Sequence, residues 1–365
     1  MRGTIQHACR VTRPVERICV LRFGAMGDIL LTTPAVRALS RRYPSARIDF
    51  VVGKGAVPIV TGIPYISRTI EFDKLATDAL PFGFLAFLKG LREADYDLFV
   101  NFQPSVKTRV MAFASAAPRV LTFQKDRHIH PETGHMRHAV DDFYRVLEPL
   151  GVSSLGSGDR RLDFVVSPDA RARVADLLRE EGLEESDTLV LVNPGASHPV
   201  NRWPPERIAE FFAAAGHEFP VSVRMGLIGG SADVASAEAI WERIPADIRP
   251  RVMLLTGRLN VKELGAVIER ASVVVTADTG PMHVASAVGT PIVALFGPAD
   301  PFRTGPVGPT GKHLVVVNKD GLDCVPCRRR SCARGDTACM TQLSVERVLS
   351  AVQTQLARAR DRVAA

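Results

Sequence analysis

The stretch SVVVTADTGPMH, residues 272–283, carries the pattern that decides the fold. Residues 272–276 form a short, mostly β-branched apolar run, which is typical of a buried strand. Gly280 permits a tight turn, and Pro281 suits the first turn of a helix that we expect over residues 281–288. The stretch therefore reads as one unit of strand, polar turn and helix.

The same alternation extends from this unit in both directions along the chain. We expect strands at residues 18–23, 47–52, 96–102, 188–192, 222–228, 252–255, 272–276 and 291–295, the last of which closes the run. We expect helices at residues 29–43, 138–150, 168–181, 205–215, 232–244, 261–270 and 281–288. Because apolar strands that alternate with helices form parallel sheets covered on both faces, the sequence predicts an α/β fold with two Rossmann-like lobes. Ligands bind such sheets at the carboxyl ends of the strands, so we expect loops there to face a central cleft.

The length of 365 residues is sufficient for two domains of roughly 100–200 residues each. We expect an N-terminal extension over residues 1–17, a first lobe over 18–167, a second lobe over 168–343, and a C-terminal helix over 344–365 that packs back on the first lobe. No apolar run approaches the roughly 20 residues that span a bilayer, and residues 1–17 lack the apolar segment of a secretory signal. We therefore expect a cytoplasmic protein.

The formal net charge of +7 favours an anionic partner. Only 6% of the residues are aromatic, so the chain has little material for stacking on bases, and no recognition-helix or RNA-binding motif is present. These observations argue against nucleic acid and leave an anionic small molecule or a membrane surface as partners.

The turn that contains Asp278, Thr279 and Gly280 is a candidate phosphate site. A helix that starts there points free N–H groups and the positive end of its dipole at the ligand, which suits a pyrophosphate. His283 lies on the first helical turn, where it and Asp278 can hold sugar hydroxyls. The alternative is that Asp278 or Thr279 only caps the helix and that His283 is a core residue.

Two other loops carry polar residues at the ends of expected strands. Asp28 follows the turn Gly24-Ala25-Met26-Gly27 and is a candidate general base, although it is also well placed to cap the next helix. The segment from Asn193 to Trp203 offers hydroxyl, amide and guanidinium donors to phosphates, with the tryptophan as a packing anchor. Its alternative reading is an ordinary loop around a buried tryptophan.

Taken together in this order, the loops resemble those of the ADP-heptose:lipopolysaccharide heptosyltransferases, the family 9 glycosyltransferases of the GT-B fold. The resemblance extends from Ile18 to about Leu349. Its specific parts are Met26-Gly27-Asp28, the segment from Pro194 to Pro204, Asp278-Thr279-Gly280 with His283, and Phe296-Gly297-Pro298 followed by Asp300-Pro301. The resemblance implies an inverting, metal-independent transfer of a heptose from ADP-heptose to the inner core of lipopolysaccharide, with an acceptor-binding first lobe and a nucleotide-sugar-binding second lobe.

Residue by residue, the resemblance implies the following roles. Asp28 is the catalytic base. The residues that bind the donor are Ser197, Asn201 and Arg202 near its phosphates, Asp233 at the ribose, Leu259 in the adenine pocket, Thr279 and Gly280 at the pyrophosphate, and Asp278 and His283 at the sugar. Asn201 is a departure, because related enzymes carry a lysine at that position, and Arg202 is the neighbouring cation.

The acceptor side is expected between Pro104 and Arg145, where basic residues outnumber acidic ones by seven to four. The candidate acceptor-binding residues there or just before are Gln103, Lys107, Arg109 and Arg127. Acidic sugars and phosphates of a lipopolysaccharide precursor would attract these cations, as would the inner face of the inner membrane. A solvated helix face is the alternative for any one of them.

Four of the six cysteines cluster as Cys324-x2-Cys327-x4-Cys332-x6-Cys339. The opening Cys-x2-Cys spacing is common among zinc ligands, and four thiols can close a tetrahedral site. A structural zinc, an iron–sulfur cluster, reduced metal-free thiols and two disulfides formed only on oxidation are the open interpretations. Catalysis is expected to need no cofactor.

Three alternative functions remain on the sequence alone. The first is a transferase of the same family with another nucleotide sugar or acceptor. The second is a nucleotide-sugar epimerase on a similar scaffold, and the third is a nucleic-acid-binding module around the cysteine cluster.

Overall fold

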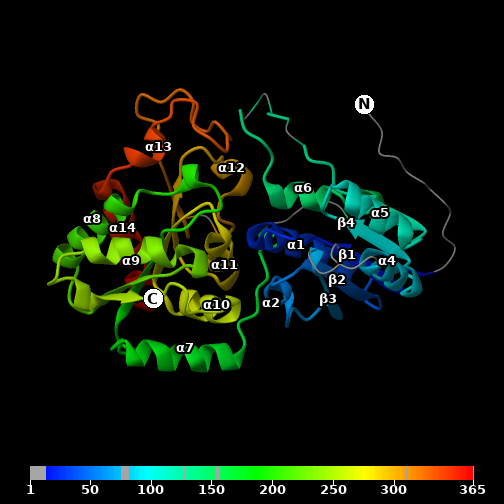
Figure 1. Ribbon diagram of the computed structural model, residues 1–365, viewed down its shortest axis with the longest axis horizontal. Helices are drawn as coiled ribbons and strands as arrows, with labels where there is room; N and C mark the ends of the chain where they lie inside the picture. The colour runs from blue at the N-terminus through cyan, green and yellow to red at the C-terminus, as the bar shows by residue number, and fades with distance from the viewer. Residues whose placement is uncertain are drawn as a thin grey trace. The chain divides into compact units, whose positions relative to one another are not determined.

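The computed structural model describes residues 14–74, 82–126, 128–130, 132, 134–152, 157–309 and 311–364. The chain divides into two compact units, the first ending at Val165 and the second beginning at Val166. Each unit is a parallel β-sheet with helices packed on it, coloured from blue to green and from green to red in Figure 1. No helix among the described residues is both long and apolar enough to cross a membrane.

The first unit contains a five-stranded sheet in the order β3-β2-β1-β4-β5. Its strands are β1 (Arg17–Leu21), β2 (Arg47–Gly53), β3 (Arg68–Phe72), β4 (Leu98–Asn101) and β5 (Arg119–Thr122). Its helices are α1 (Met26–Arg42), α2 (Val57–Val60), α4 (Gly83–Glu93), α5 (Val106–Ala114) and α6 (Ala139–Arg145). All paired strands are parallel, so the loops that follow β1 and β4, which are neighbours, leave the sheet at the same edge.

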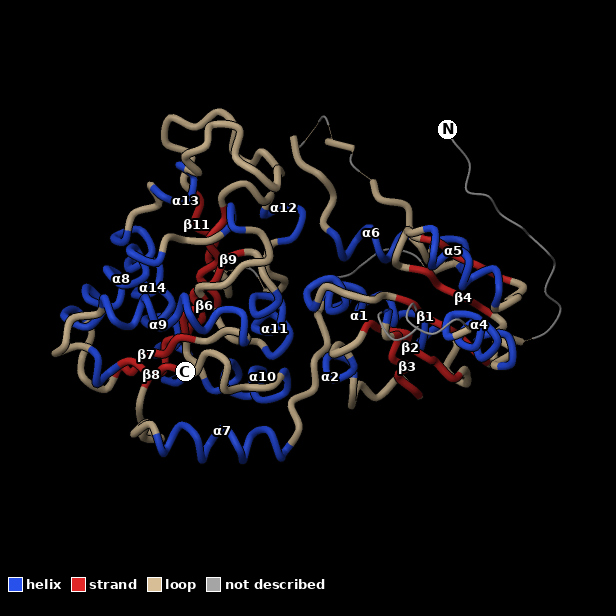
Figure 2. Tube along the Cα trace, in the orientation of Figure 1, coloured by secondary structure: helices blue, strands red, loops and turns tan. Residues whose placement is uncertain are grey.

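The second unit contains a six-stranded parallel sheet in the order β11-β10-β9-β6-β7-β8. Its strands are β6 (Thr188–Asn193), β7 (Val223–Leu227), β8 (Val252–Leu254), β9 (Val273–Ala277), β10 (Ile292–Phe296) and β11 (Leu314–Val317). The helices are α7 (Pro168–Glu180), α8 (Pro205–Glu218), α9 (Val234–Arg243), α10 (Val261–Arg270), α11 (Gly280–Val288), α12 (Pro301–Thr304), α13 (Ala338–Thr341) and α14 (Val345–Ala364). Figure 2 shows the red strands of this unit flanked by blue helices.

All eight expected strands are present, but β3, β5 and β11 were not expected, and β11 rather than β10 ends the run. Each of these three is an edge strand, and each has only intermediate or exposed positions apart from Phe72. A strand that is covered incompletely does not need a continuous apolar sequence, which explains why the pattern missed it.

Helix α14 packs on the second unit. It lies against α8 and against strands β9, β10 and β11. Val348, Val352 and Leu356 belong to the same buried cluster as the α8 residues, and Trp203 Nε1 donates a hydrogen bond to the Leu343 carbonyl at 3.0 Å. Its apolar face is therefore buried within its own unit.

Candidate functional site

The loops after β6 and β9 are joined at the carboxyl edge of the second sheet. Asn193 and Thr276 are register partners at the ends of these neighbouring strands. The buried Asn193 amide donates to Thr276 Oγ1 at 3.2 Å, to Thr279 Oγ1 at 3.2 Å and to the Gly195 carbonyl at 3.0 Å. These bonds fix both loops, so the Asn193 amide, which was expected to be a phosphate donor, joins the two loops instead.

Helix α11 begins directly beyond this junction without a side-chain cap. Thr279 is its N-cap residue in an extended conformation, and its hydroxyl makes no capping bond because it faces Asn193 and Thr276 instead. The first N–H groups of a helix lack partners within the helix. The start of α11 at Gly280 therefore offers N–H donors and a positive dipole end to an anion.

Asp278 and His283 flank this helix start. His283 Nε2 lies 3.8 Å from Asp278 Oδ1, and the histidine is buried. Thr304 Oγ1 on α12 donates to Asp278 Oδ2 at 2.8 Å. The two side chains therefore lie close together at the start of α11, with the carboxylate oriented from α12.

Asp233 brings the loop after β7 against the loop after β6. Its carboxylate accepts from the Gly230 N–H at 3.0 Å, and a Cβ on Gly195 would lie 2.5 Å from its Oδ1. Only glycine leaves room for this approach. Leu259 is half-buried in the loop after β8. In the same loop, the Gly257 N–H donates to the Gly229 carbonyl of the loop after β7 at 3.1 Å. The structure therefore connects Asp233, Thr279 and Gly280 through Gly195 and Asn193.

The remaining donor-side residues belong to the long loop after β6. Ser197 and Arg202 are exposed, and Asn201 is half-buried. Arg202 Nε and Nη2 both donate to the Ala196 carbonyl at 3.2 Å, so part of the guanidinium is held against its own loop. Trp203 is buried against Phe211, which anchors the loop as expected.

In the first unit, Asp28 lies in the first turn of α1 and pairs with Arg22. Arg22 Nη2 is 2.5 Å from Asp28 Oδ2, and the Ala25 N–H donates to the same oxygen at 3.3 Å. Arg22 is itself held by the Phe102 carbonyl, at 2.7 Å from Nη1, and lies over the Phe143 ring. Sequence reasoning missed Arg22, although an arginine directly after the apolar strand β1 was a readable signal.

The candidate acceptor residues are placed differently from one another. Gln103 follows Phe102 at the end of β4, so it lies next to the carbonyl that Arg22 contacts, and its buried Oε1 has no hydrogen-bond partner among the described residues. Lys107 Nζ lies 5.7 Å from the Phe72 ring centroid and 5.1 Å from that of Phe84. Arg109 is exposed on α5. Arg127 lies outside the described residues.

The four clustered cysteines are free thiols that line one small cavity of about 20 Å³. Burial, followed by the neighbouring Cys327, Cys324 and Cys332, raises the pKa of Cys339 to about 11. The Thr337 N–H has the largest effect on Cys332 and lowers its pKa. Burial opposes this with a smaller effect, and the N–H groups of Arg334 and Gly335 lower the pKa further. Within the described ranges, no three His, Cys, Asp or Glu side chains already stand at metal-ligating separations.

Comparison with known proteins identifies the family. Residues 84–337 match the family model of glycosyltransferase family 9 (heptosyltransferase). The lipopolysaccharide core heptosyltransferase OpsX of Haemophilus influenzae is 25% identical over 304 residues, which cover 81% of this chain and 83% of that protein.

Solved structures confirm the expected GT-B fold class. A family 9 glycosyl transferase from Veillonella parvula superposes with a TM-score of 0.79 and 25% identity, covering 95% of this chain and 99% of that one. The E. coli heptosyltransferase WaaC with ADP-2-deoxy-2-fluoro heptose gives a TM-score of 0.65 and 19% identity, covering 93% and 99% of the two chains. With a family match over more than half of its length, the chain belongs to glycosyltransferase family 9.

Proposed function

We propose that the protein transfers a heptose from ADP-heptose to the inner core of a lipopolysaccharide precursor, with inversion at the anomeric carbon and without a divalent metal. Membership of a heptosyltransferase family makes it a glycosyltransferase. The names of the relatives support the substrates, since OpsX is a lipopolysaccharide core enzyme and WaaC was solved with an ADP-heptose analogue.

The single observation that carries the donor assignment is the Asn193 hydrogen-bond junction beside the uncapped start of α11. Fixed N–H groups there face the place where negative charge grows on the leaving ADP, and they stabilise it without reorganisation. Asp233 would meet the ribose, with Leu259 against the adenine. Asp278 and His283 would bind the sugar hydroxyls.

The chemistry needs one base and one stabilised leaving group. We assign the base to Asp28, whose carboxylate takes the proton from the acceptor hydroxyl as that oxygen bonds to the anomeric carbon. The bond between this carbon and the diphosphate oxygen breaks on the opposite face, and ADP leaves with the electron pair. Attack opposite the leaving group inverts the anomeric centre. Arg22 acts by holding the carboxylate in place.

Peripheral contact with the inner face of the inner membrane is the third part of the proposal. Val106, Val110 and Phe113 follow one face of α5, where Val106 is 79% and Phe113 is 87% exposed. Phe82 and Leu85 are also exposed on and beside α4, which packs against α5 (Figure 1). The cations that accompany these apolar residues on the two helices are Lys89, Arg92, Lys107 and Arg109. An apolar face with flanking cations suits an anionic lipid surface in the cytoplasm.

Binding to vesicles tests the membrane contact. The double variant Val110→Ser, Phe113→Ser is expected to sediment less with phosphatidylglycerol vesicles while keeping its transfer rate on a soluble acceptor fragment. Val221→Ser is the matched control, because Val221 is 81% exposed in the second unit. Equal sedimentation of all three proteins would reject this surface.

A donor panel tests the transfer itself. Calorimetry with ADP-heptose, UDP-sugars and GDP-sugars is expected to show binding of ADP-heptose, and transfer to a lipopolysaccharide core acceptor is expected to survive EDTA. Asp278→Ala and His283→Ala should weaken donor binding, whereas Asp247→Ala, an exposed carboxylate, should not.

Each other outcome of the panel points to a different enzyme. Binding of another nucleotide sugar would replace ADP-heptose within the same family. Conversion of the donor without any acceptor would indicate an epimerase, and loss of transfer in EDTA would overturn the metal-independent step.

A further inference from the structure

The segment between β11 and α14 contains little regular structure apart from the four residues of α13. It nevertheless places four free thiols around one cavity, and it does so within sixteen residues. We propose that Cys324, Cys327, Cys332 and Cys339 form a structural site for one thiophilic divalent cation, Zn²⁺. This site goes beyond the proposed transfer reaction, in which it takes no chemical part.

The size of the cavity and the chemistry of its lining fit a single ion. A volume of about 20 Å³ corresponds to about one water-sized sphere. Four thiolates are the ligand set of closed, tetrahedral structural zinc sites, and soft sulfur ligands select Zn²⁺ over Mg²⁺ or Ca²⁺. Because the sulfurs line the cavity wall without standing at ligating separations, binding requires them to turn inward. Cys324 is exposed, and Cys327 and Cys332 are only partly buried, which leaves their side chains room to do so.

The backbone turns and the charges around the cavity suit a cluster of four sulfur ligands. Arg328, directly after Cys327, and Gly335, three residues after Cys332, both have positive φ, at 58° and 80°, so the chain turns sharply after each cysteine. The Cys332 thiol donates a hydrogen bond to Asp336 Oδ1 at 3.9 Å. Arg329, Arg334 and Asp336 line the same cavity, and Arg334 Nη2 pairs with Asp336 Oδ2 at 3.0 Å. The net positive charge of these three side chains offsets part of the net negative charge of four thiolates around one Zn²⁺.

This segment also supports the donor side of the second unit. A Cβ on Gly297 would lie 2.9 Å from Cys339 Sγ, so α13 rests on the loop that follows β10. Arg328 Nη2 pairs with the buried Asp300 Oδ2 at 2.6 Å, and Asp300 caps α12. Thr304 of α12 in turn orients Asp278 at 2.8 Å. Ordering of the cysteine segment by a metal therefore stabilises the position of a donor-side carboxylate.

Metal content of the full-length protein, purified with a reductant and without an affinity metal, tests the site directly. We expect about one Zn²⁺ per chain by elemental analysis. Cys324→Ser and Cys332→Ser are the informative variants, because these thiols are not in the core and their replacement costs little packing. Both variants should lose most of the metal and melt at lower temperature. Cys9→Ser removes a thiol that is remote in sequence from the cluster, so this variant should keep the metal content and the melting temperature of the original protein.

Cobalt substitution gives a second, spectroscopic readout. Co²⁺-loaded protein should show intense thiolate-to-metal charge-transfer absorption that is absent in Cys332→Ser. Metal-free protein in which the four clustered cysteines are free thiols or form two disulfides, with the same melting temperature before and after chelation, would overturn the proposal. One iron per chain in place of zinc would overturn the choice of metal. The donor dissociation constant should rise on chelation, and because this last readout rests on the proposed function, the metal stoichiometry decides the site independently of it.

Discussion

Two of the arginine–aspartate pairs that involve helix α1 of the first unit differ in one respect. Arg22 pairs with Asp28 at the start of the helix, and Arg37, further along it, pairs with Asp163. Both arginine side chains are 10% exposed. The carboxylate of Asp28, however, is 43% exposed, and that of Asp163 only 12%. The same pair of residue types thus occurs once with its carboxylate open to solvent and once with it enclosed.

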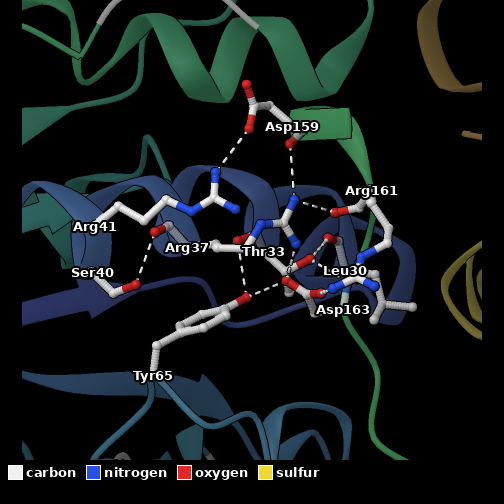
Figure 3. A network of polar contacts seen from close by, with 9 residues as sticks. All are labelled: Leu30, Thr33, Arg37, Ser40, Arg41, Tyr65, Asp159, Arg161 and Asp163. Atoms are coloured by element: carbon white, nitrogen blue, oxygen red, sulfur yellow. Dashed lines mark hydrogen bonds and ion pairs between the residues drawn. The ribbon is translucent and has the colours of Figure 1, made fainter. Parts of the chain in front are cut away.

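The partners of the two carboxylates explain the difference. Asp163 accepts from Arg37 and Tyr65 on one oxygen and from Arg161 on the other, and its N–H donates to Thr33 Oγ1 at 2.9 Å (Figure 3). Arg37 also donates to the carbonyls of Asp159 and Arg161. This network fixes residues 159–163 to α1. Both contacts of Asp28 fall on Oδ2, which leaves Oδ1 without a partner among the described residues. A carboxylate with partners on both oxygens stabilises the fold, whereas one with a free oxygen can accept a proton from a substrate.

Breaking the enclosed pair should have the largest effect on stability. Arg37→Met is expected to lower the free energy of unfolding by about 3 kcal/mol, the low end of the range for breaking a buried pair, because the enclosed Asp163 carboxylate then keeps only the exposed Arg161, at 3.3 Å, as its cation. Urea denaturation followed by circular dichroism measures this. Arg41→Met removes the exposed pair with Asp159 and should change the free energy by no more than about 1 kcal/mol. Equal losses in the two variants would remove the distinction between the pairs.

Breaking the open pair should act on turnover instead. Arg22→Met is expected to lower kcat by roughly ten- to a hundredfold, because the Asp28 carboxylate loses its orientation. KM for the donor should stay near its original value. Arg22→Lys should recover part of the rate through the charge alone, and an unchanged kcat in Arg22→Met would exclude a positioning role.

Removing a hydroxyl from the enclosed network should have a smaller effect. Tyr65 donates to Asp163 Oδ2 at 2.5 Å, and burial, followed by the Asp163 charge, raises the pKa of this tyrosine. Tyr65→Phe should therefore cost about 1.5 kcal/mol of stability, the value typical of a hydrogen bond to a charged group. Chemical denaturation measures it, and a loss as large as that of Arg37→Met would mean that Tyr65 rather than Arg37 carries the network.

The smallest effect is expected from Lys262, whose pKa is lowered by burial. Burial lowers the pKa of Lys262 in α10 to about 8, whereas an unfolded lysine titrates near 10.4. Below about pH 8 the folded protein carries the full cost of the buried charge, and this cost disappears as the pH rises toward the unfolded value. Lys262→Met should therefore raise Tm at pH 7 by a few degrees, and the difference from the original protein should shrink between about pH 8 and 10. A difference independent of pH would show that packing rather than charge is responsible.

Local pattern was enough for most of the fold and for part of the site. Continuous apolar runs predicted strands such as β6 and β9 correctly, and the turn at Asp278 to Gly280 was predicted from its residue types. The half-exposed edge strands β3, β5 and β11 carried no such signal. The enclosed pair was missed because Arg37 and Asp163 are 126 residues apart in the sequence. Arg22 and Asp28 are close in sequence, but the Phe102 carbonyl that holds Arg22 is 80 residues away. Such partners are set by the tertiary fold, which no local window contains.

The proposed role of Asp28 as the catalytic base is tested most directly by the transfer rate of Asp28→Asn. The rate should be measured at saturating ADP-heptose with a lipopolysaccharide core acceptor, next to the donor dissociation constant and the free energy of unfolding. We predict that the rate falls at least about a hundredfold, as expected for loss of a general base, while donor binding and stability stay near those of the original protein. A transfer rate within a few fold of the original, in protein that is folded and binds donor, would contradict the assignment.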